Sequence, residues 1–434
     1  MKKWIQGLCL TTIVLSSTQV ITLPFGGISL FQLSLIITMM ASIAVFFFRK
    51  KICISKNNVI LMIAWIISSF TAYLLSDYPS IARSYLLVGI MTSYFIICIP
   101  AFFSIDDIDK LERALIRSQY ITIIMSIYTY YMFYFGGGLR SSIVLPLGMH
   151  IDLDRDFAIR AQASGQVRLA LPYATPPVLS GVMSICIVIL LTNKNLFPKL
   201  IRFLLLGIYS IILLYTGSRT GYVSLIIFVG FYGFRYLKAK QNRNKKLILM
   251  VFVICLVFAA IYLWNRSSYF KLFIGRMDLK TMLQDRHVQL FVDGILIWTE
   301  SIKNIFIGIG FGNGMNYTHM KSGGAPYFFN FFVTTVAERG LLGLVIVIIL
   351  VAYLVKAFKY IVKIDDHRII SVGAIYITAL ISALFYEMLS CYFVVIVVSI
   401  FCMAAQSNLM VAKNTKTTLA YQYDDLVDTN TKGI

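Results

Sequence analysis

Charged residues are scarce in this chain, at 13% of 434 residues, whereas 59% of the residues are hydrophobic. The mean hydropathy is +0.81. A soluble domain of this length cannot hide so much apolar surface, whereas a bilayer requires repeated apolar windows of about 20 residues. The composition therefore excludes a soluble domain and indicates an integral membrane protein. Because the windows are continuous rather than alternating, helices are favoured over a barrel.

The sequence lacks several features that mark other protein classes: cysteines in its long loops, a signal-peptide cleavage site and an internal repeat. The two long loops expected at about 136–173 and 265–327 contain no cysteine, so no disulfide framework is indicated. No small-x-small cleavage site follows the opening MKKWIQGLCLTTIVL, which we interpret as a retained first helix rather than a signal peptide. No pair of related halves of the transporter type is evident. GIGFGNG (308–314) lacks the strand and helix that surround a nucleotide loop, so a turn explains it better.

The apolar windows predict about twelve membrane-spanning helices and therefore an all-α fold. The spans are expected at residues 4–23, 28–48, 59–75, 81–103, 118–135, 174–192, 200–216, 220–237, 247–264, 328–355, 369–387 and 390–410. Residues 1–410 then form one polytopic membrane domain, and the polar residues 411–434 form a disordered cytoplasmic tail. We expect short helices within the two long loops, where function tends to reside.

Basic residues gather in alternate loops and at the termini, which hold 25 of the 39 lysines and arginines. By the positive-inside rule these loops and both termini lie in the cytoplasm, and the two long loops lie outside. The net charge of +20 is thus mainly a topology signal. It does not indicate nucleic-acid binding.

On the outer side arginine outnumbers lysine, by 10 residues to 4. Lysine suffices to anchor a loop, whereas the planar guanidinium of arginine binds two phosphate oxygens at once. The outer face is therefore predicted to hold a phosphate-bearing anion. For any single arginine the alternative is snorkelling at a helix end. Arg140, Arg160 and Arg168 are the weaker candidates for contact with glycan or phosphate.

Arg219 lies in TGSRTG (216–221), a short gap between two apolar stretches. It stands at the N-terminal end of the second stretch, where Gly217 and Gly221 allow close approach of the backbone. The free amides at a helix start add partial positive charge. We expect an anion at this point to meet both a guanidinium and a helix terminus.

The second long loop contains a helical pattern, HVQLFVDGILIWTESI. Apolar residues recur in it at steps of three and four, namely Val288, Phe291, Val292, Ile295, Trp298 and Ile302. Such a stripe suits a helix that lies on the membrane surface or under a catalytic cavity. A structural helix packed on the bundle is an equally good interpretation.

The ordered motifs resemble those of the O-antigen polymerase and O-antigen ligase superfamily. They are TGSRTG, DRHVQLFVDGILIW followed by FIGIGFGNG, and FNFFVTTVAERGLLGLV, over about residues 200–355. The resemblance implies a GT-C-like architecture in the bacterial inner membrane. It implies transfer of glycan from an undecaprenyl pyrophosphate carrier to an acceptor, with no cofactor, metal or nucleotide sugar. The implied partners are the undecaprenyl-pyrophosphate-linked oligosaccharide, membrane lipids and a chain-length regulator protein, and no nucleic acid.

Individual residues take their implied roles from this resemblance. Arg219 matches an arginine implied to bind pyrophosphate, and Arg286 matches one implied to grip the same group. Asn330 and Glu338 fall in the spacing of the family's HN…E.G..G pattern, together with two glycines. Phe329 occupies the place where ligases carry histidine, which removes the expected ligase base and favours a polymerase.

The chemistry needs little beyond charge neutralisation and orientation, because pyrophosphate is an excellent leaving group. A base for the acceptor hydroxyl would help, and the candidates are Asp285, His287, His319 and Glu338. Glu338 has an alternative role in an ion pair with Arg339, and His287 has one as an ordinary interfacial residue. The predicted catalytic set is Arg219, Arg286, His287 and Glu338. The predicted substrate-binding set is Arg140, Arg160, Arg168, Arg276, His319, Asn330 and Arg339.

Three functions follow from these observations. The leading hypothesis is a polysaccharide polymerase, for O-antigen, that moves the growing chain from undecaprenyl pyrophosphate to an incoming lipid-linked repeat unit. The second is a ligase that attaches finished glycan to lipid A-core. The third is a flippase of lipid-linked oligosaccharide, but a flippase should carry its charges within its spans rather than in long outer loops.

Overall fold

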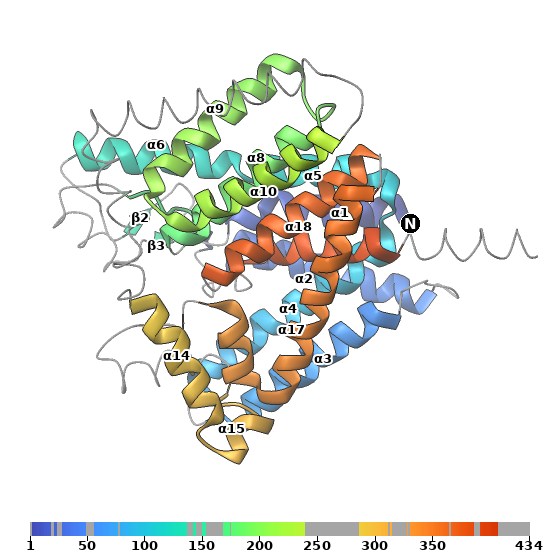
Figure 1. Cartoon of the computed structure of the whole chain (residues 1–434), viewed down its shortest axis with the longest axis vertical. Coiled ribbons are helices and arrows are strands. Elements are labelled where there is room, and N and C mark those ends of the chain that lie inside the picture. The colour runs from blue at the N-terminus through green and yellow to red at the C-terminus, as the bar shows by residue number, and fades with distance from the viewer. Residues whose placement is uncertain are drawn as a thin grey trace, which may run out of the picture.

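The computed structural model describes residues 2–18, 21–23, 28–48, 56–76, 79–136, 142–144, 150–152, 168–173, 175–238, 286–310, 313–314, 328, 330–363, 366–385 and 391–406. In these residues the chain is a bundle of helices with one small sheet (Figure 1). The helices are α1 (Lys2–Val14), α2 (Leu30–Phe48), α3 (Lys56–Leu74), α4 (Pro79–Phe102), α5 (Ile108–Ser118), α6 (Tyr120–Tyr134), α8 (Pro176–Thr192), α9 (Lys199–Thr216), α10 (Arg219–Lys238), α14 (Arg286–Thr299), α15 (Ile302–Phe306), α17 (Phe331–Lys363), α18 (His367–Phe385) and a last helix, Tyr392–Gln406. Two 3-10 turns, η1 (Leu15–Thr18) and η2 (Ile105–Asp107), complete the helical part.

The predicted spans coincide with helices wherever the structure describes them, with one exception. The first, 4–23, is shorter than expected because α1 ends at Val14. The ninth, 247–264, lies outside the described residues. Among the described residues, four helices (α2, α9, α17 and α18) are both long and apolar enough to cross a membrane, or five if a bent helix pair counts as one span. A predominantly helical fold is therefore confirmed for the described residues, and its apolar helices are consistent with a membrane protein, whereas the number twelve stays a prediction.

The two long loops, at about 136–173 and 265–327, differ in their content. The second contains the predicted short helices, α14 and α15. The described residues of the first instead include two strands, β2 (Ser142–Val144) and β3 (His150–Asp152). Together with β1 (Ile21–Thr22) they form an antiparallel sheet in the order β1-β3-β2, with Ile151 opposite both Ile21 and Ile143. Hydropathy could not predict the pairing of β1 with β3, because these strands are about 130 residues apart in the sequence.

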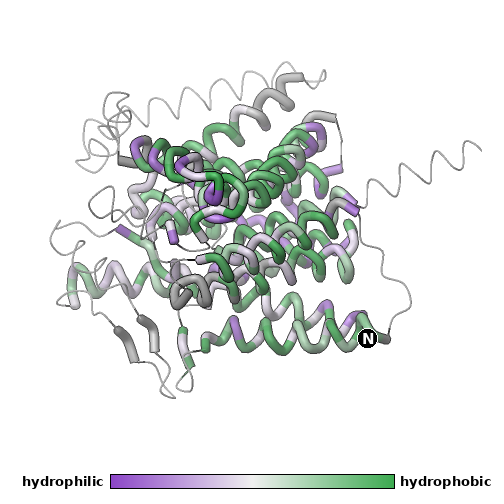
Figure 2. Tube along the Cα trace, turned by 90° about the horizontal axis from the view of Figure 1, so that it is seen from below, coloured by the Kyte–Doolittle hydropathy of each residue, from purple (hydrophilic) through white to green (hydrophobic). Residues whose placement is uncertain are grey.

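Apolar side chains cover the outside of the bundle as well as its interior. Figure 2 shows hydrophobic residues along most of the length of the described helices. Phe47 of α2 is 85% exposed and Leu200 of α9 is 77% exposed. Contiguous exposed apolar surface on this scale is incompatible with water but suits lipid contact. The structure thus supports the membrane assignment that the composition predicts.

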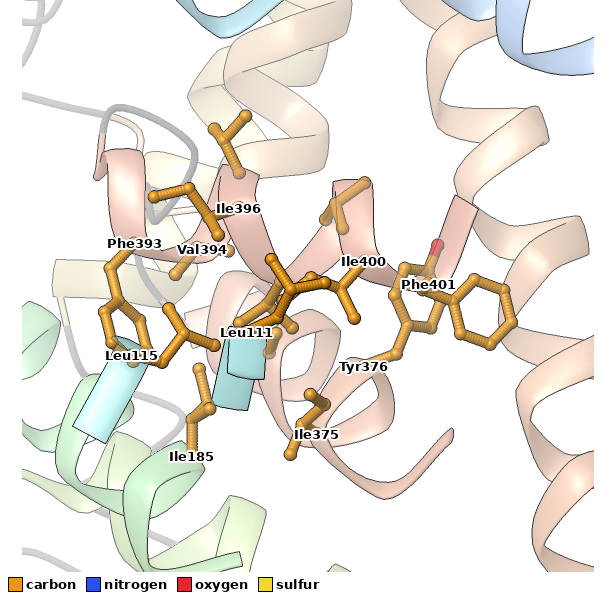
Figure 3. Close-up of a cluster of buried hydrophobic side chains, with 14 of the residues drawn as sticks. Leu111, Leu115, Ile185, Ile375, Tyr376, Phe393, Val394, Ile396, Ile400 and Phe401 are labelled. Carbon is orange, nitrogen blue, oxygen red and sulfur yellow. The ribbon is translucent and has the colours of Figure 1, made fainter. Parts of the chain in front are cut away.

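The interior is organised around α18 and the last helix, which are buried along nearly all of their length. Figure 3 shows side chains of four elements meeting there, namely Leu111 and Leu115 of α5, Ile185 of α8, Ile375 and Tyr376 of α18, and Phe393, Val394, Ile396, Ile400 and Phe401 of the last helix. The rings of Tyr376 and Phe401 stack with centroids 4.1 Å apart. The predicted spans 81–103 and 118–135 leave α5 in the cytoplasmic loop between them, although Ile108, Leu111 and Leu115 recur at helical spacing.

A buried carboxylate ties α5 to the central helices. Glu112 accepts hydrogen bonds from Ser371 Oγ at 2.5 Å and from Asn193 Nδ2 at 2.8 Å, and its side chain is fully buried. The amide of Asn193 also donates to Asp109 at 2.7 Å. Burial raises the pKa of Glu112 to about 7, and the charge of Asp109 acts in the same direction. The carboxyl group is therefore expected to titrate near neutral pH.

This shift predicts that the protein loses stability as pH rises. Below the ordinary pKa near 4.5 both folded and unfolded states hold the proton, so Glu112 carries no ionisation cost. Between 4.5 and about 7 the folded state alone retains it, and above that range the full cost of ionising a buried group applies. We expect Glu112→Gln to be more stable than the native protein at pH 8, by about 3 kcal/mol. Melting temperatures of the purified protein from pH 5 to pH 8 check this expectation.

The exposed residue Glu300 provides the matched control, because Glu300→Gln should keep the pH dependence of the native protein. In Glu112→Gln the amide can donate to Ser371 Oγ and accept from Asn193, so the packing is retained. Equal slopes of melting temperature against pH in the native protein and Glu112→Gln would contradict the assignment.

Candidate functional site

The predicted anion site begins at the turn between α9 and α10. α9 ends at Thr216, and Gly217 adopts a left-handed conformation with φ 55° and ψ 26°. The hydroxyl of Thr216 accepts from the backbone N–H of Ser218 at 3.3 Å, and α10 then begins at Arg219. A glycine after a helix end commonly closes the helix in this way. The sequence TGSR therefore places Arg219 at the first position of α10, as predicted.

The start of α10 is held closely against α8. A side chain at Gly221 would meet Ser180 O and Leu213 Cδ1 at 2.6 Å, so only glycine fits without displacement. The backbone N–H of Gly221 donates to Ser180 Oγ at 3.2 Å, and Ser184 Oγ donates to Gly221 O at 3.0 Å. Gly221 thus permits close approach of α10 to α8, whereas close approach of an anion to this backbone stays a prediction. One amide of the helix start is consequently bonded to α8 rather than directed to a ligand.

A second predicted region, ERG at 338–340, is a break within α17. The backbone at Gly340 has φ 58° and ψ −138°. Gly343 packs so closely on Thr335 that a side chain at Gly343 would overlap the Thr335 carbonyl. The sequence predicted one continuous span here, because hydropathy does not report backbone dihedral angles. A helix that ends inside the fold leaves carbonyl groups without partners. The break must therefore be supported from another segment.

The support comes from residues 308–310 and 314 of the glycine-rich motif. The backbone N–H groups of Ile309 and Gly310 donate to the carbonyls of Ala337 and Glu338, at 2.9 Å and 3.2 Å. The N–H of Gly314 donates to Glu338 Oε1 at 3.1 Å. The described residues of this motif, Gly308–Gly310 and Gly314, thus fit against the break in α17.

Glu338 and Arg339 are both buried at this break, each with 4% of its surface exposed. The Arg339 guanidinium lies 4.4 Å from the centre of the Trp65 ring, and one of its nitrogens donates to Ser68 Oγ at 3.4 Å. A cation over an indole ring is stabilised by the ring's negative face. α3 therefore supplies the neighbours of Arg339 that a local ion-pair hypothesis did not include.

Asn330 caps the first part of α17. Its Oδ1 accepts from the backbone N–H groups of Phe332 at 2.9 Å and Val333 at 3.1 Å, while Nδ2 donates to Leu384 O at 2.7 Å. An asparagine at this position satisfies free N–H groups of the helix start. The same bonds tie the start of α17 to the end of α18.

The loop helix α14 packs on α17 with one face. A side chain at Gly294 would overlap Val333, and Leu290 and Ile297 are fully buried. Part of the predicted apolar stripe faces outward instead: Phe291, Val292 and Ile295 are exposed. Trp298 is partly buried, and its indole N–H donates to Ile305 O at 3.2 Å. This arrangement combines a packed helix with an exposed apolar face, which favours a helix at the membrane surface.

The predicted site residues fall into three groups. Arg168, Asn330, Glu338 and Arg339 form hydrogen bonds or ring contacts within the protein. Arg219 is the first residue of α10, and Arg286 and His287 are the first two residues of α14. In Figure 1 α10 and α14 both begin on the left side, where β2 and β3 also lie. Arg140, Arg160, Arg276 and His319, with the alternative base Asp285, lie outside the described residues.

Asn313 is a polar residue of this region that the sequence analysis did not select. Its side chain is fully buried, and Nδ2 donates to Ser76 Oγ at 2.5 Å and to Ile309 O at 2.9 Å. Its Oδ1 has no hydrogen-bond partner among the described parts of the chain. An asparagine between two glycines of a motif was the available signal. Trp65 on α3 and Ser76 just beyond its end gave none, because they lie more than 200 residues away.

A family model described as O-antigen ligase matches residues 203–348. This region begins in α9 and ends in the second half of α17, so it includes the Arg219 turn, α14 and the break at Gly340. The match supports a relationship of this region to the O-antigen polymerase and ligase superfamily. Members of this family are glycosyltransferase-like enzymes, polymerases or ligases. A search of curated proteins gave no match.

Proposed function

We propose that this protein is a polysaccharide polymerase, for O-antigen, that uses an undecaprenyl-pyrophosphate-linked donor on the outer face of the bacterial inner membrane. The observation that supports it is the family domain, which unites the Arg219 turn, α14 and the glycine-supported break in one matched region. Phe329, which stands where ligases carry histidine, favours a polymerase over a ligase. In this proposal both termini are cytoplasmic, and a chain-length regulator protein is a partner.

The proposed reaction joins two lipid-linked glycans. A hydroxyl at the non-reducing end of the incoming repeat unit attacks the anomeric carbon of the donor chain and forms the new glycosidic bond. The bond from that carbon to the pyrophosphate breaks, and undecaprenyl pyrophosphate leaves with the electron pair. The hydroxyl proton passes to a base. The products are one longer lipid-linked chain and one free carrier.

Arg219 and Arg286 neutralise the charge that grows on the leaving pyrophosphate. Each begins a helix, so its guanidinium acts together with the positive end of that helix. Among the residues that the structure describes, His287 and Glu338 are the candidates for the base. Glu338 accepts the N–H of Gly314, which holds one carboxylate oxygen in a fixed direction. Arg140, Arg160, Arg276, His319, Asn330 and Arg339 remain proposed contacts to glycan or phosphate.

Deletion of the gene tests the proposal through the surface lipopolysaccharide. For a polymerase we expect core capped with a single repeat unit, because repeat units are still exported and ligated but not joined. A ligase would instead leave uncapped core and long lipid-linked chains. A flippase would trap repeat units inside the cell. Either of the last two patterns would overturn the proposal. Gel electrophoresis of lipopolysaccharide identifies the singly capped core, and analysis of the lipid-linked glycans distinguishes the other two patterns.

A further inference from the structure

Arg168 lies where the first outer loop joins the membrane domain, beside the turn that precedes Arg219. Its Nε donates to Thr216 O at 3.0 Å, and its Nη2 donates to Gly217 O at 3.3 Å. The backbone N–H of Leu169 donates to Tyr215 O at 3.0 Å. Two adjacent residues of the loop therefore bond three consecutive carbonyl groups at the end of α9.

These carbonyls matter for any anion that approaches Arg219. The C-terminal end of a helix concentrates partial negative charge on carbonyls that have no partner within the helix. Thr216 and Gly217 precede Arg219 by only three and two residues, so their carbonyls lie at the edge of the proposed site. The Arg168 guanidinium both bonds these oxygens and opposes their charge.

The segment that carries Arg168 is itself anchored in the core. Leu169 and Ala170 are buried, and the hydroxyl of Tyr173 donates to Gln119 Oε1 at 3.0 Å. The same hydroxyl lies 3.0 Å from Ser17 Oγ. Arg168 is thus held at the end of a short buried strap, which fixes the distance between the loop and the turn.

We infer that Arg168 is a positioning residue: it holds the 216–219 turn and covers the α9 carbonyls, so that Arg219 can receive the pyrophosphate. This assigns its guanidinium to the protein rather than to direct contact with the anion. The inference rests on the proposed function for the identity of the anion. The contact between Arg168 and the turn can be tested without it.

Hydrogen–deuterium exchange of the whole protein in lipid nanodiscs tests the contact. We expect Arg168→Ala to speed exchange of amides at 213–222 by about tenfold, because the turn loses two bonds. Amides at 199–210, at the opposite end of α9, should not change. Arg168→Lys should give an intermediate rate, since one ammonium can donate to either carbonyl.

Arg202→Ala is the matched control. Arg202 lies near the start of α9, at the opposite end of the helix from the 216–219 turn. It donates to Lys194 O at 3.2 Å and lies over the Phe203 ring. Its loss should leave exchange at 213–222 unchanged. Unaltered exchange at 213–222 in Arg168→Ala would overturn the inference.

A kinetic cycle on elongation of lipid-linked repeat units separates positioning from direct binding. If Arg168 acts through Arg219, Arg168→Ala lowers kcat/KM about tenfold in the native background and has no further effect in Arg219→Ala. Equal losses in both backgrounds would show direct contact and overturn the inference. If the native protein elongates no chains, the proposed function fails, while the exchange result still decides the role of Arg168.

Discussion

Arg219→Lys should reduce polymerisation by at least about 100-fold in kcat/KM, the size of effect seen when one donor to a developing anionic charge is lost. Lysine keeps the charge but presents one compact ammonium where arginine presents a planar fork. The turn at Gly217 and the packing of Gly221 on α8 fix where α10 starts, so a different side chain at its first position cannot recover the geometry by moving the helix. Purified protein with lipid-linked repeat units measures the rate, and gels of surface lipopolysaccharide measure chain length.

Arg202→Lys provides a control of the same chemistry on the preceding helix. Arg202 lies at the other end of α9, so we expect its replacement to leave chain length and rate unchanged. Arg286→Lys should resemble Arg219→Lys, because Arg286 begins α14 and is proposed to grip the same pyrophosphate. Long chains at normal level and length in both Arg219→Lys and Arg286→Lys would refute the bidentate phosphate role.

The position of Arg219 could be predicted because the signals for it are local. Two continuous apolar runs define the helices, and a glycine between them marks the end of the first helix. Both signals lie within a few residues of one another, so no tertiary information is needed. The same reasoning explains why most span boundaries agree with the helices to within a few residues.

The surroundings of Glu338 and Arg339 could not be predicted because they are assembled from distant segments. Trp65, which faces Arg339, is on α3, and Gly314, which donates to Glu338, comes from the second long loop. A hydropathy window through Gly340 also remains apolar on both sides, so it conceals the break. The amphipathic α5 was missed for the opposite reason, because its charged face lowers the window average although Leu111 and Leu115 are buried.

The break in α17 has a functional consequence for the family domain. A continuous helix through 338–340 would carry Glu338 away on an ordinary helical face. The break instead presents its carbonyls and carboxylate to residues 308–310 and 314, which are in the same long loop as α14. The turn, the break and α14 are therefore one packed unit, and a change in any of them should affect the others.

Gly308→Ala should disrupt this unit and cost roughly 3 to 5 kcal/mol of stability. Gly308 has φ 84°, a region that side chains disfavour, and an added Cβ would overlap the backbone carbon and oxygen of Glu338. Relief requires the turn to move away, which also weakens the bonds from Ile309 and Gly310 at about 1 kcal/mol each. A loss of this size is a large part of the stability of a typical folded protein. We expect a lower melting temperature and less monodisperse protein after size-exclusion chromatography.

Gly207→Ala is the matched control, since Gly207 lies within α9 and an added Cβ meets nothing within 4 Å. Alanine favours a helix over glycine, so this variant should be neutral or slightly more stable. Gly340→Ala should instead behave like Gly308→Ala, because its Cβ would lie 2.5 Å from backbone atoms of Phe306 and Ile307 at φ 58°. If Gly308→Ala and Gly340→Ala both have the same melting temperature as Gly207→Ala, the glycine-rich motif and the break are not packed against each other. The structural basis for placing Glu338 beside the second outer loop would then be lost.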